Sequence, residues 1–133
     1  MKVIVCGGRD FSDRAFVFGA LDSIDAACRI DLVIHGAASG ADSLAEEWAW
    51  DRGVESWPCP VDWATHGRAA GPIRNRHMLT IGAELLVAFP GGKGTADMIK
   101  QAKSKGVQVF QPMPLEQDHT IEATASEKGS FLP

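Results

Sequence analysis

The chain has 133 residues, 45% of them hydrophobic, and a formal net charge of −4. This length and hydrophobic fraction suit one globular domain with its own core. The acidic balance argues against nonspecific nucleic-acid binding as the main role, so nucleic acid is not expected as a partner. No run approaches the roughly 18 consecutive apolar residues of a membrane span, and the first residues suggest a strand rather than a signal peptide. We therefore expect a cytoplasmic protein that does not contact a membrane.

Short runs rich in Val, Ile and Leu alternate with helical patterns along the first 111 residues. The strands lack polar alternation, which is typical of a parallel sheet covered on both faces. We expect Ser12 and Ser39 to cap helix N-termini, and Gly53, Gly82 and Gly106 to end helices. In chain order, the sequence predicts strand 2–7, helix 13–28, strand 31–35, helix 41–52, strand 54–58, helix 72–82, strand 84–89, helix 95–105 and strand 107–111.

Five such strands joined by right-handed crossovers form a doubly wound α/β sheet, for which we predict the order 3-2-1-4-5. Ligands of such sheets bind where the order reverses, here between the first and fourth strands. The loops 7–10 and 90–95 would then face each other, with the loop 36–40 as a side wall. We assign residues 1–111 to this single domain, and residues 112–133 to a C-terminal tail that is irregular or packed on a partner subunit.

The run Phe89-Pro90-Gly91-Gly92-Lys93-Gly94-Thr95-Ala96-Asp97 joins the fourth strand to the last helix. Glycines let backbone N–H groups approach an anion closely, and a helix N-terminus adds unpaired donors and a positive dipole end. The spacing G-x-G-x-x-G is absent, and Lys93 is followed by Gly94 where a P-loop has Ser or Thr, so neither a nicotinamide dehydrogenase nor a P-loop ATPase is expected. We interpret the run as a phosphate cradle, with a plain strand-to-helix turn as the alternative.

Basic residues lie in or beside loops that follow strands, namely Arg9, Arg68, Arg74, Arg76 and Lys93. A basic pocket in an acidic protein indicates a small anionic ligand, the alternative being solvated surface charge. Arg74, in the first turn of its helix, can contact a phosphate in bidentate fashion, whereas Arg76 points about 200° away. Alternatively, the arginines tie the long loop 59–71 to the body of the domain.

The loop 59–71 is longer than most connections, and Trp57 and Trp63 lie in or beside it. One interpretation is a lid, or a wall on which a base stacks, and the other is a buried hydrophobic flap.

The cysteines Cys6, Cys28 and Cys59 lack the spacing of a metal site, so we expect buried free thiols, no metal and no cofactor. Apolar helix residues such as Phe16, Phe18 and Trp50 cannot all face one small sheet, which favours a homo-oligomer.

Four ordered motifs, at residues 7–10, 36–42, 74–76 and 90–95, resemble the small standalone SLOG domains related to YspA and YpsA. These domains belong to a Rossmann-like group that includes the Lonely Guy phosphoribohydrolases and the DNA-processing protein DprA. The resemblance covers about residues 1–111 and implies a Rossmann-like fold, a nucleotide-type small molecule as ligand, and a homo-oligomer. Lonely Guy enzymes cleave the N-glycosidic bond of cytokinin nucleotides and carry the motif P-G-G-x-G-T-x-x-E, with an arginine on the preceding helix. Pro90 to Thr95 match that motif, and Arg74 matches the arginine.

The chain departs from this motif at Met98, which stands where the glutamate is expected. A thioether cannot stabilise the oxocarbenium-like state of glycosidic cleavage, so Met98 is better interpreted as a core residue. Asp97 is rotated by about 100° from it on the helix, and is either a substitute carboxylate or a surface partner of Lys100 or Gln101. Arg74 and Asp97 are the two candidate catalytic residues.

We predict a protein that binds a nucleoside phosphate or an ADP-ribose-like ligand, with the phosphate on residues 91–95 and Arg74. Ribose or base would lie toward Gly8, Arg9, Asp10 and Ser39. Asp10 and Asp42 could supply the missing carboxylate from other loops, although Asp42 fits a capping box with Ser39 equally well. The alternatives are a phosphoribohydrolase acting on a nucleoside 5′-monophosphate and a DprA-like binder of single-stranded DNA. The predicted ligand-binding residues are Gly7, Gly8, Arg9, Asp10, Gly36, Ser39, Gly40, Asp42, Arg74, Asn75, Gly91, Gly92, Lys93, Gly94 and Thr95.

Overall fold

The computed structural model describes residues 1–114, in which five strands form one parallel sheet. The order β3-β2-β1-β4-β5 confirms the predicted topology. Each strand pairs in parallel with its neighbour, and Val3, for example, lies opposite Val33 on one side and Leu85 on the other. The strands are β1 (Lys2–Cys6), β2 (Leu32–His35), β3 (Glu55–Pro58), β4 (Leu85–Ala88) and β5 (Gln108–Phe110).

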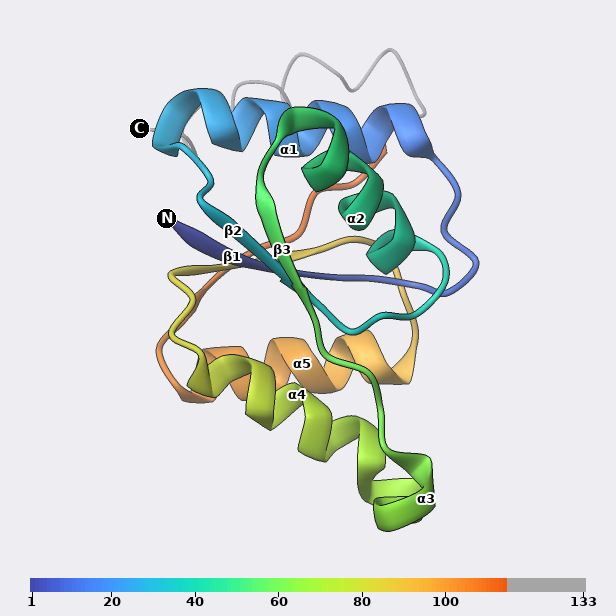
Figure 1. Cartoon of the computed structure of the whole chain (residues 1–133). Helices are drawn as coiled ribbons and strands as arrows, with labels where there is room; N and C mark the ends of the chain where they lie inside the picture. Colours follow the sequence, from blue (N-terminus) through green and yellow to red (C-terminus); the bar gives the residue numbers. More distant parts are fainter. Residues whose placement is uncertain (115–133) are drawn as a thin grey trace.

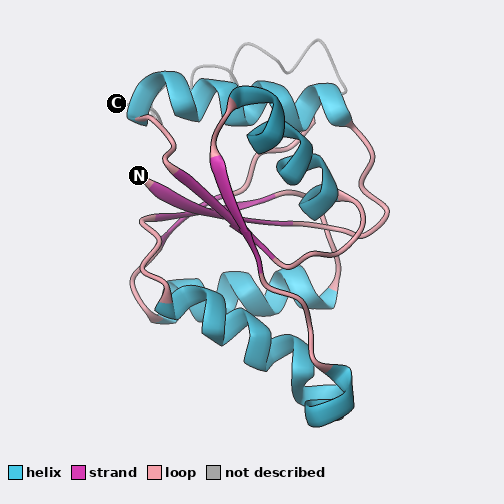
Figure 2. Ribbon diagram, viewed as in Figure 1, coloured by secondary structure: helices cyan, strands magenta, loops and turns pink. Residues whose placement is uncertain are grey.

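Helices cover both faces of the sheet, which gives the three layers of a Rossmann-like α/β fold (Figures 1 and 2). The helices α1 (Arg14–Cys28) and α2 (Ala41–Arg52) cover one face, and α4 (Ala70–Thr80) and α5 (Lys93–Ser104) cover the other. Between β3 and α4 lie the short helix α3 (Trp63–His66) and the single 3₁₀ turn η1 (Gly67–Ala69). This short helix projects beyond the layers at one corner of the molecule (Figure 1).

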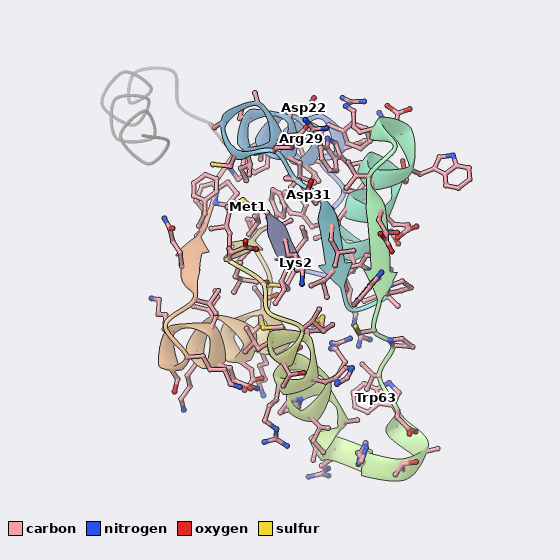
Figure 3. The ribbon with its side chains drawn as sticks, turned by 60° about the vertical axis from the view of Figure 1, so that its left-hand side comes forward. Met1, Lys2, Asp22, Arg29, Asp31 and Trp63 are labelled. Carbon is pink, nitrogen blue, oxygen red and sulfur yellow. The ribbon has the colours of Figure 1, made fainter. Side chains whose placement is uncertain are left out.

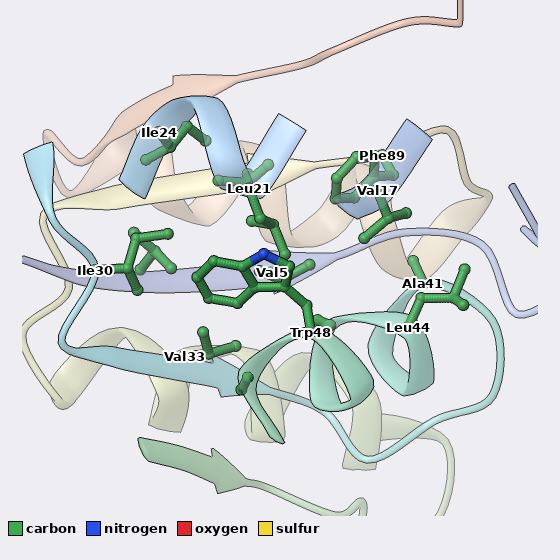
Figure 4. Close-up of a cluster of buried hydrophobic side chains, with 14 of the residues drawn as sticks. Val5, Val17, Leu21, Ile24, Ile30, Val33, Ala41, Leu44, Trp48 and Phe89 are labelled. Atoms are coloured by element: carbon green, nitrogen blue, oxygen red, sulfur yellow. The ribbon is translucent and has the colours of Figure 1, made fainter. Parts of the chain in front are cut away.

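Two apolar cores, one on each face, explain why the strand sequences do not alternate. Val3 and Val5 of β1 pack in the core under α1 and α2, whereas Ile4 packs in the core above α4 and α5. Trp48 is completely buried at the centre of the first core (Figure 4), and its indole N–H donates a hydrogen bond of 2.8 Å to Asp22. Burying such a side chain contributes roughly 1.5–3 kcal/mol, so both helix layers are firmly attached to the sheet.

Two helix N-termini differ from the sequence prediction. Asp13 caps α1 in place of Ser12, because its Oδ1 accepts a hydrogen bond of 3.1 Å from the Phe16 N–H. Gly40 is the N-cap residue of α2, and no side chain caps this end, so Ser39 is not a cap and the predicted capping box is absent. The backbone of Gly40 has a φ of 74° and lies so close to the loop after β1 that a Cβ would clash with its carbonyl oxygens. Loop packing therefore replaces side-chain capping at this end.

Three other expectations from the sequence are corrected. The helix predicted at 72–82 begins at Ala70, and the loop before it contains α3 and η1, which were not predicted. Phe18 is buried beneath the Arg14 guanidinium, and Phe16 packs partly buried against Phe89, so neither forms an exposed apolar surface. Of the three residues proposed for an interface, Trp50 is the one that is exposed, at 85%.

All three cysteines are free thiols, but Cys28 is exposed rather than buried. Within residues 1–114, no cluster of His, Cys, Asp and Glu could hold a metal ion. The helices in this part of the chain are too short or too polar to cross a bilayer. Residues 115–133 of the predicted tail lie outside the described part.

Candidate functional site

A cavity of about 790 Å³ opens at the carboxyl ends of β1 and β4, the adjacent strands at which the strand order reverses. Doubly wound sheets bind ligands at this position. The loops after β1, β2 and β4 contribute to its walls, and so do α3 and the start of α4. The lining residues are Cys6, Gly7, Gly8, Arg9, Asp10, Phe11, Gly36, Ala38, Asp42, Val61, Trp63, Arg68, Gly71, Pro72, Arg74, Asn75, Met78, Pro90, Gly91, Gly92, Lys93, Gly94 and Thr95.

A second hollow of about 840 Å³ lies at the opposite edge of the sheet, where residues 25–31 and 52–55 lead into β2 and β3. Arg29 and Asp31 lie at this edge in Figure 3, whereas Trp63 lies on the projecting helix. The second hollow contains none of the predicted site residues and no glycine-rich turn at a helix N-terminus. The first cavity is therefore the candidate site.

The N-terminus of α5 presents unpaired backbone donors to the cavity. Its first helical hydrogen bond runs from Ala96 N–H to the Gly92 carbonyl, at 3.0 Å, so the N–H groups of Lys93, Gly94 and Thr95 precede the helical bonding pattern. The N-cap residue Gly92 provides no side-chain cap. A Cβ on Gly92 or Gly94 would meet no protein atom within 4 Å. The protein's own packing therefore does not require glycine at these two positions, and both border the cavity.

Other glycines of the motifs hold the loops together. A Cβ on Gly91 would clash with the Thr95 hydroxyl and would lie 2.7 Å from the Gly8 nitrogen. The Gly8 N–H donates to the Pro90 carbonyl at 2.8 Å, which joins the loop after β1 to the loop after β4. Close contact between these two loops leaves no room for side chains, so Gly8 and Gly91 are fixed by the fold itself.

The loop after β2 completes this contact. Ala41 N–H donates to the Gly8 carbonyl at 3.1 Å, and the Ser39 hydroxyl donates to the Arg9 carbonyl at 3.2 Å. Ser39 does not line the main cavity but borders an adjoining hollow of about 270 Å³, which Arg9 and Trp63 also line. Gly40 lines neither, so its role is the loop contact described above.

Arg74 both lines the cavity and braces its walls. Nη1 donates to the Gly36 carbonyl at 2.7 Å and to the Cys59 carbonyl at 3.3 Å, and Nε donates to Asn75 Oδ1 at 3.0 Å. Burial lowers the pKa of the guanidinium, and the nearby Asp42 carboxylate partly offsets this effect. Nη2 makes no hydrogen bond with residues 1–114, so it remains available to a ligand. The bond to Cys59 agrees with the interpretation that Arg74 ties the loop 59–71 to the domain.

Asp97 lies behind the cavity rather than in its wall. Its Oδ2 accepts hydrogen bonds from Asn75 Nδ2 at 3.0 Å and from Gln101 Nε2 at 2.7 Å. The Asn75 Nδ2 also donates to the Gly94 carbonyl at 3.2 Å, so this buried amide links Arg74 to the first turn of α5. The structure thus pairs Asp97 with Gln101, as one sequence interpretation had it, and gives it a positioning role.

Met98 and Cys6 provide no catalytic group. Met98 is completely buried in the core between α4, α5 and the sheet. Cys6 borders the cavity, but burial, with a contribution from Asp42, raises the pKa of its thiol to about 12. The thiol is therefore protonated at neutral pH and is a poor nucleophile.

Cationic side chains outnumber carboxylates in the cavity lining, four to two. Four cationic side chains line it, those of Arg9, Arg68, Arg74 and Lys93, and none forms an ion pair with a carboxylate in residues 1–114. The remaining predicted cation, Arg76, is exposed and lies outside the lining. Cations that converge on a concave surface concentrate anionic ligands there. The cavity therefore favours an anion.

Two carboxylates also line the cavity. Asp10 is exposed, whereas Asp42 is 6% exposed and its Oδ2 accepts the N–H groups of Gly36 at 3.1 Å and Ala38 at 3.2 Å. Burial is the main cause of a raised pKa for Asp42. Asp42 thus shapes the loop after β2, not the end of its own helix.

The loop 59–71, for which one sequence interpretation was a wall, does line the cavity, but the prediction missed the helix α3 and left Val61, Trp63 and Arg68 out of the site residues. Trp63 is 53% exposed and lines the cavity together with Val61 and Arg68. Trp57, by contrast, is outside the cavity and donates to Glu55 at 2.8 Å. One signal for α3 was present in the sequence, namely an N-cap residue at Asp62. In the structure Asp62 caps α3 by accepting a hydrogen bond of 3.1 Å from the Thr65 N–H.

Residues 1–66 match the model of the "YspA, cpYpsA-related SLOG family". The Gene 61 protein of Mycobacterium phage D29 is 35% identical over 117 residues, covering 82% of this chain and 94% of the phage protein. The chain belongs to the YspA, cpYpsA-related SLOG family. Among solved structures, DNA processing protein A (DprA) from Streptococcus pneumoniae has the same fold, with a TM-score of 0.70 and 15% identity over 96% of this chain. This chain spans 56% of the DprA chain.

Proposed function

We propose that this SLOG protein binds a nucleotide or a nucleotide-derived ligand, of the nucleoside phosphate or ADP-ribose type, in the cavity at β1 and β4. The observation that carries the proposal is the uncapped N-terminus of α5, where Gly92 and Gly94 border open space beneath unpaired cations. Backbone N–H groups at a helix N-terminus bind phosphate through direct hydrogen bonds and the helix dipole. The phosphate would lie on residues 91–95, beside Lys93 and Nη2 of Arg74.

The base and ribose would occupy the part of the cavity lined by Gly8, Arg9, Asp10 and Trp63. Trp63 is half-exposed at this wall, so one face of its indole can stack on a nucleobase. Ser39 would contribute through the adjoining hollow, which shares the Arg9 and Trp63 walls with the main cavity.

Binding without hydrolysis is the version of this function that the geometry supports best. A phosphoribohydrolase needs a carboxylate facing the glycosidic bond. The family position of that carboxylate is held by the buried Met98, and Asp97 is engaged with Asn75 and Gln101. Asp10 and Asp42 line the cavity from other loops, and they are the carboxylates to replace if hydrolysis is observed. The expectation that nucleic acid is not a partner gains no support from a fold shared with a DNA-processing protein, so single-stranded DNA belongs among the competitors tested.

Isothermal titration calorimetry with adenosine 5′-monophosphate, ADP-ribose, adenosine and inorganic phosphate tests the proposal. We expect the phosphorylated nucleosides to bind and unphosphorylated adenosine to bind much more weakly. Native mass spectrometry of the purified protein would reveal a retained nucleotide and identify its base. If neither nucleotide binds and no nucleotide is retained, the proposed function is wrong. Binding of a short single-stranded oligonucleotide in that case would assign the cavity to nucleic acid.

A further inference from the structure

Asp42 is a buried carboxylate of which one oxygen has no hydrogen-bond partner in residues 1–114. Its side chain is among the few buried polar groups, and it forms no ion pair with the cavity cations. The two hydrogen bonds that it accepts, from Gly36 and Ala38, both go to Oδ2. Oδ1 therefore has no hydrogen-bond partner within residues 1–114.

Oδ1 is not fully enclosed, and its residue lines the cavity. Across residues 1–114, every fully enclosed side-chain nitrogen or oxygen has a hydrogen-bond partner. Because Oδ1 has none, it is not fully enclosed, and Asp42 is one of the cavity's lining residues. A carboxylate oxygen is thus presented to the ligand from the floor of the loop after β2.

Support of the loop does not explain the charge. An asparagine side chain would accept the same two N–H bonds with its carbonyl oxygen and would avoid the cost of burying a carboxylate. Burial does raise the pKa of Asp42, which is the sign of that cost. The carboxylate differs from an amide in its charge and in its second acceptor, and the second acceptor is the one that faces the cavity.

A carboxylate repels a phosphate unless the same ligand brings a hydrogen-bond donor to it. In a nucleotide, the phosphate has no donor at neutral pH, and the nearest donors are the ribose hydroxyls. Asp42 and Arg74 lie on the same side of Gly36, since a Cβ there would approach Nη1 of Arg74 and lie 3.0 Å from Oδ2 of Asp42. The acceptor is thus next to a phosphate-binding arginine, where the sugar of a bound nucleotide would lie.

Resting on the proposed function, we infer that Oδ1 of Asp42 accepts a hydrogen bond from a ribose hydroxyl, so that the site selects ribonucleotides over their deoxy analogues. Asp42 is then a specificity-determining residue of the cavity. Asp51, an exposed aspartate of α2 outside the cavity lining, provides a matched control.

The experiment compares adenosine 5′-monophosphate with its 2′-deoxy and 3′-deoxy analogues by calorimetry, on the wild type, Asp42→Asn and the control Asp51→Asn. Wild type should bind at least one deoxy analogue roughly tenfold or more weakly, the effect of a lost hydrogen bond to a charged group. Asp42→Asn should discriminate clearly less, because the amide NH2 that replaces Oδ1 makes only a neutral hydrogen bond to a hydroxyl, while Asp51→Asn keeps the wild-type ratio. Circular dichroism and thermal melting confirm that the variants are folded.

The outcomes separate this inference from the proposed function. If wild type binds all three nucleotides equally, the inference is wrong and the proposed function stands. This comparison uses the wild type alone, so it does not depend on the folding of a variant. Undiminished discrimination in folded Asp42→Asn also overturns it. If wild type binds no nucleotide in the calorimeter, both the proposed function and the inference fail.

Discussion

Adding a methyl group at Gly94 should stabilise the fold and weaken ligand binding. Gly94 is the second residue of α5, it lines the cavity, and a Cβ there would meet no protein atom within 4 Å. Alanine costs less backbone entropy than glycine in a helix, so Gly94→Ala should raise the free energy of unfolding by up to about 1 kcal/mol. For a domain of this size, that corresponds to an increase in Tm of about 2–5 °C.

The same methyl group would occupy the space that a phosphate oxygen needs to reach the N–H groups of α5. Overpacking of this kind costs roughly 1–3 kcal/mol, or about 5- to 150-fold in Kd, and Gly94→Val should abolish measurable binding. Gly19→Ala is a matched control, because Gly19 is an exposed residue of α1, away from the cavity, whose Cβ would also meet nothing within 4 Å. It should raise the Tm and leave the affinity for adenosine 5′-monophosphate unchanged.

Thermal melting and calorimetry on the two alanine variants decide the matter. Stabilisation in both variants with weaker binding only in Gly94→Ala is the expected pattern. Unchanged affinity in folded Gly94→Ala and Gly94→Val would refute the assignment of the phosphate to the N-terminus of α5. Weaker binding in both alanine variants would point to a general effect of helix stabilisation instead.

Four further predictions follow from individual side chains. Arg74→Ala should lower the free energy of unfolding by about 1–3 kcal/mol, since the Gly36 carbonyl loses its donor. It should also weaken the binding of adenosine 5′-monophosphate far more than the binding of adenosine. Equal losses of affinity for the two ligands would assign Arg74 to the fold alone. Asp42→Asn should be more stable than wild type at pH 7 but not at pH 3, because burial raises the pKa of Asp42 in the folded state. The wild type therefore loses stability as the pH rises above the ordinary pKa of an aspartate, about 3.9. Urea denaturation at both pH values measures the difference. Because Met98 occupies the carboxylate position, incubation with adenosine 5′-monophosphate should release neither adenine nor ribose 5-phosphate by chromatography, and release of both would show that the protein is an enzyme. Light scattering should give at least a dimer, with the 85%-exposed Trp50 as the candidate contact, and the mass of one chain at micromolar concentration would contradict this.

The backbone of this protein was predictable from the sequence because local patterns encode it. Uninterrupted apolar strands and well-placed glycines imply a parallel sheet, and crossover handedness then leaves few strand orders. The loops after β1 and β4 therefore had to meet, and they do, through the Gly8 N–H bond to the Pro90 carbonyl. The glycine-rich turn at the start of α5, which borders the cavity, was predictable for the same reason.

The side-chain interactions across the cavity were not predictable. Arg74 reaches carbonyls at Gly36 and Cys59, which are 38 and 15 residues away in the chain, and no periodicity encodes such partners. Asp42 matched a capping box in spacing, yet the tight packing of Gly40 removed the need for a cap. The helix α3 has four residues, too few to show a helical period, so the sequence suggested a wall in the loop 59–71 but not the helix that carries Trp63.

The glycines of the phosphate motif have two different physical origins, and only one of them concerns the ligand. Gly8 and Gly91 are required by contact between neighbouring loops, so an alanine at Gly91 would destabilise the fold and reveal nothing about binding. Gly94 lacks any such requirement and lowers helix stability where it stands. The same reasoning applies to Asp42, whose second oxygen lacks a partner in the protein. A residue that lowers stability without a compensating contact in the protein indicates where a ligand supplies that contact. Gly94 and Asp42 are two such residues, and both border the same cavity.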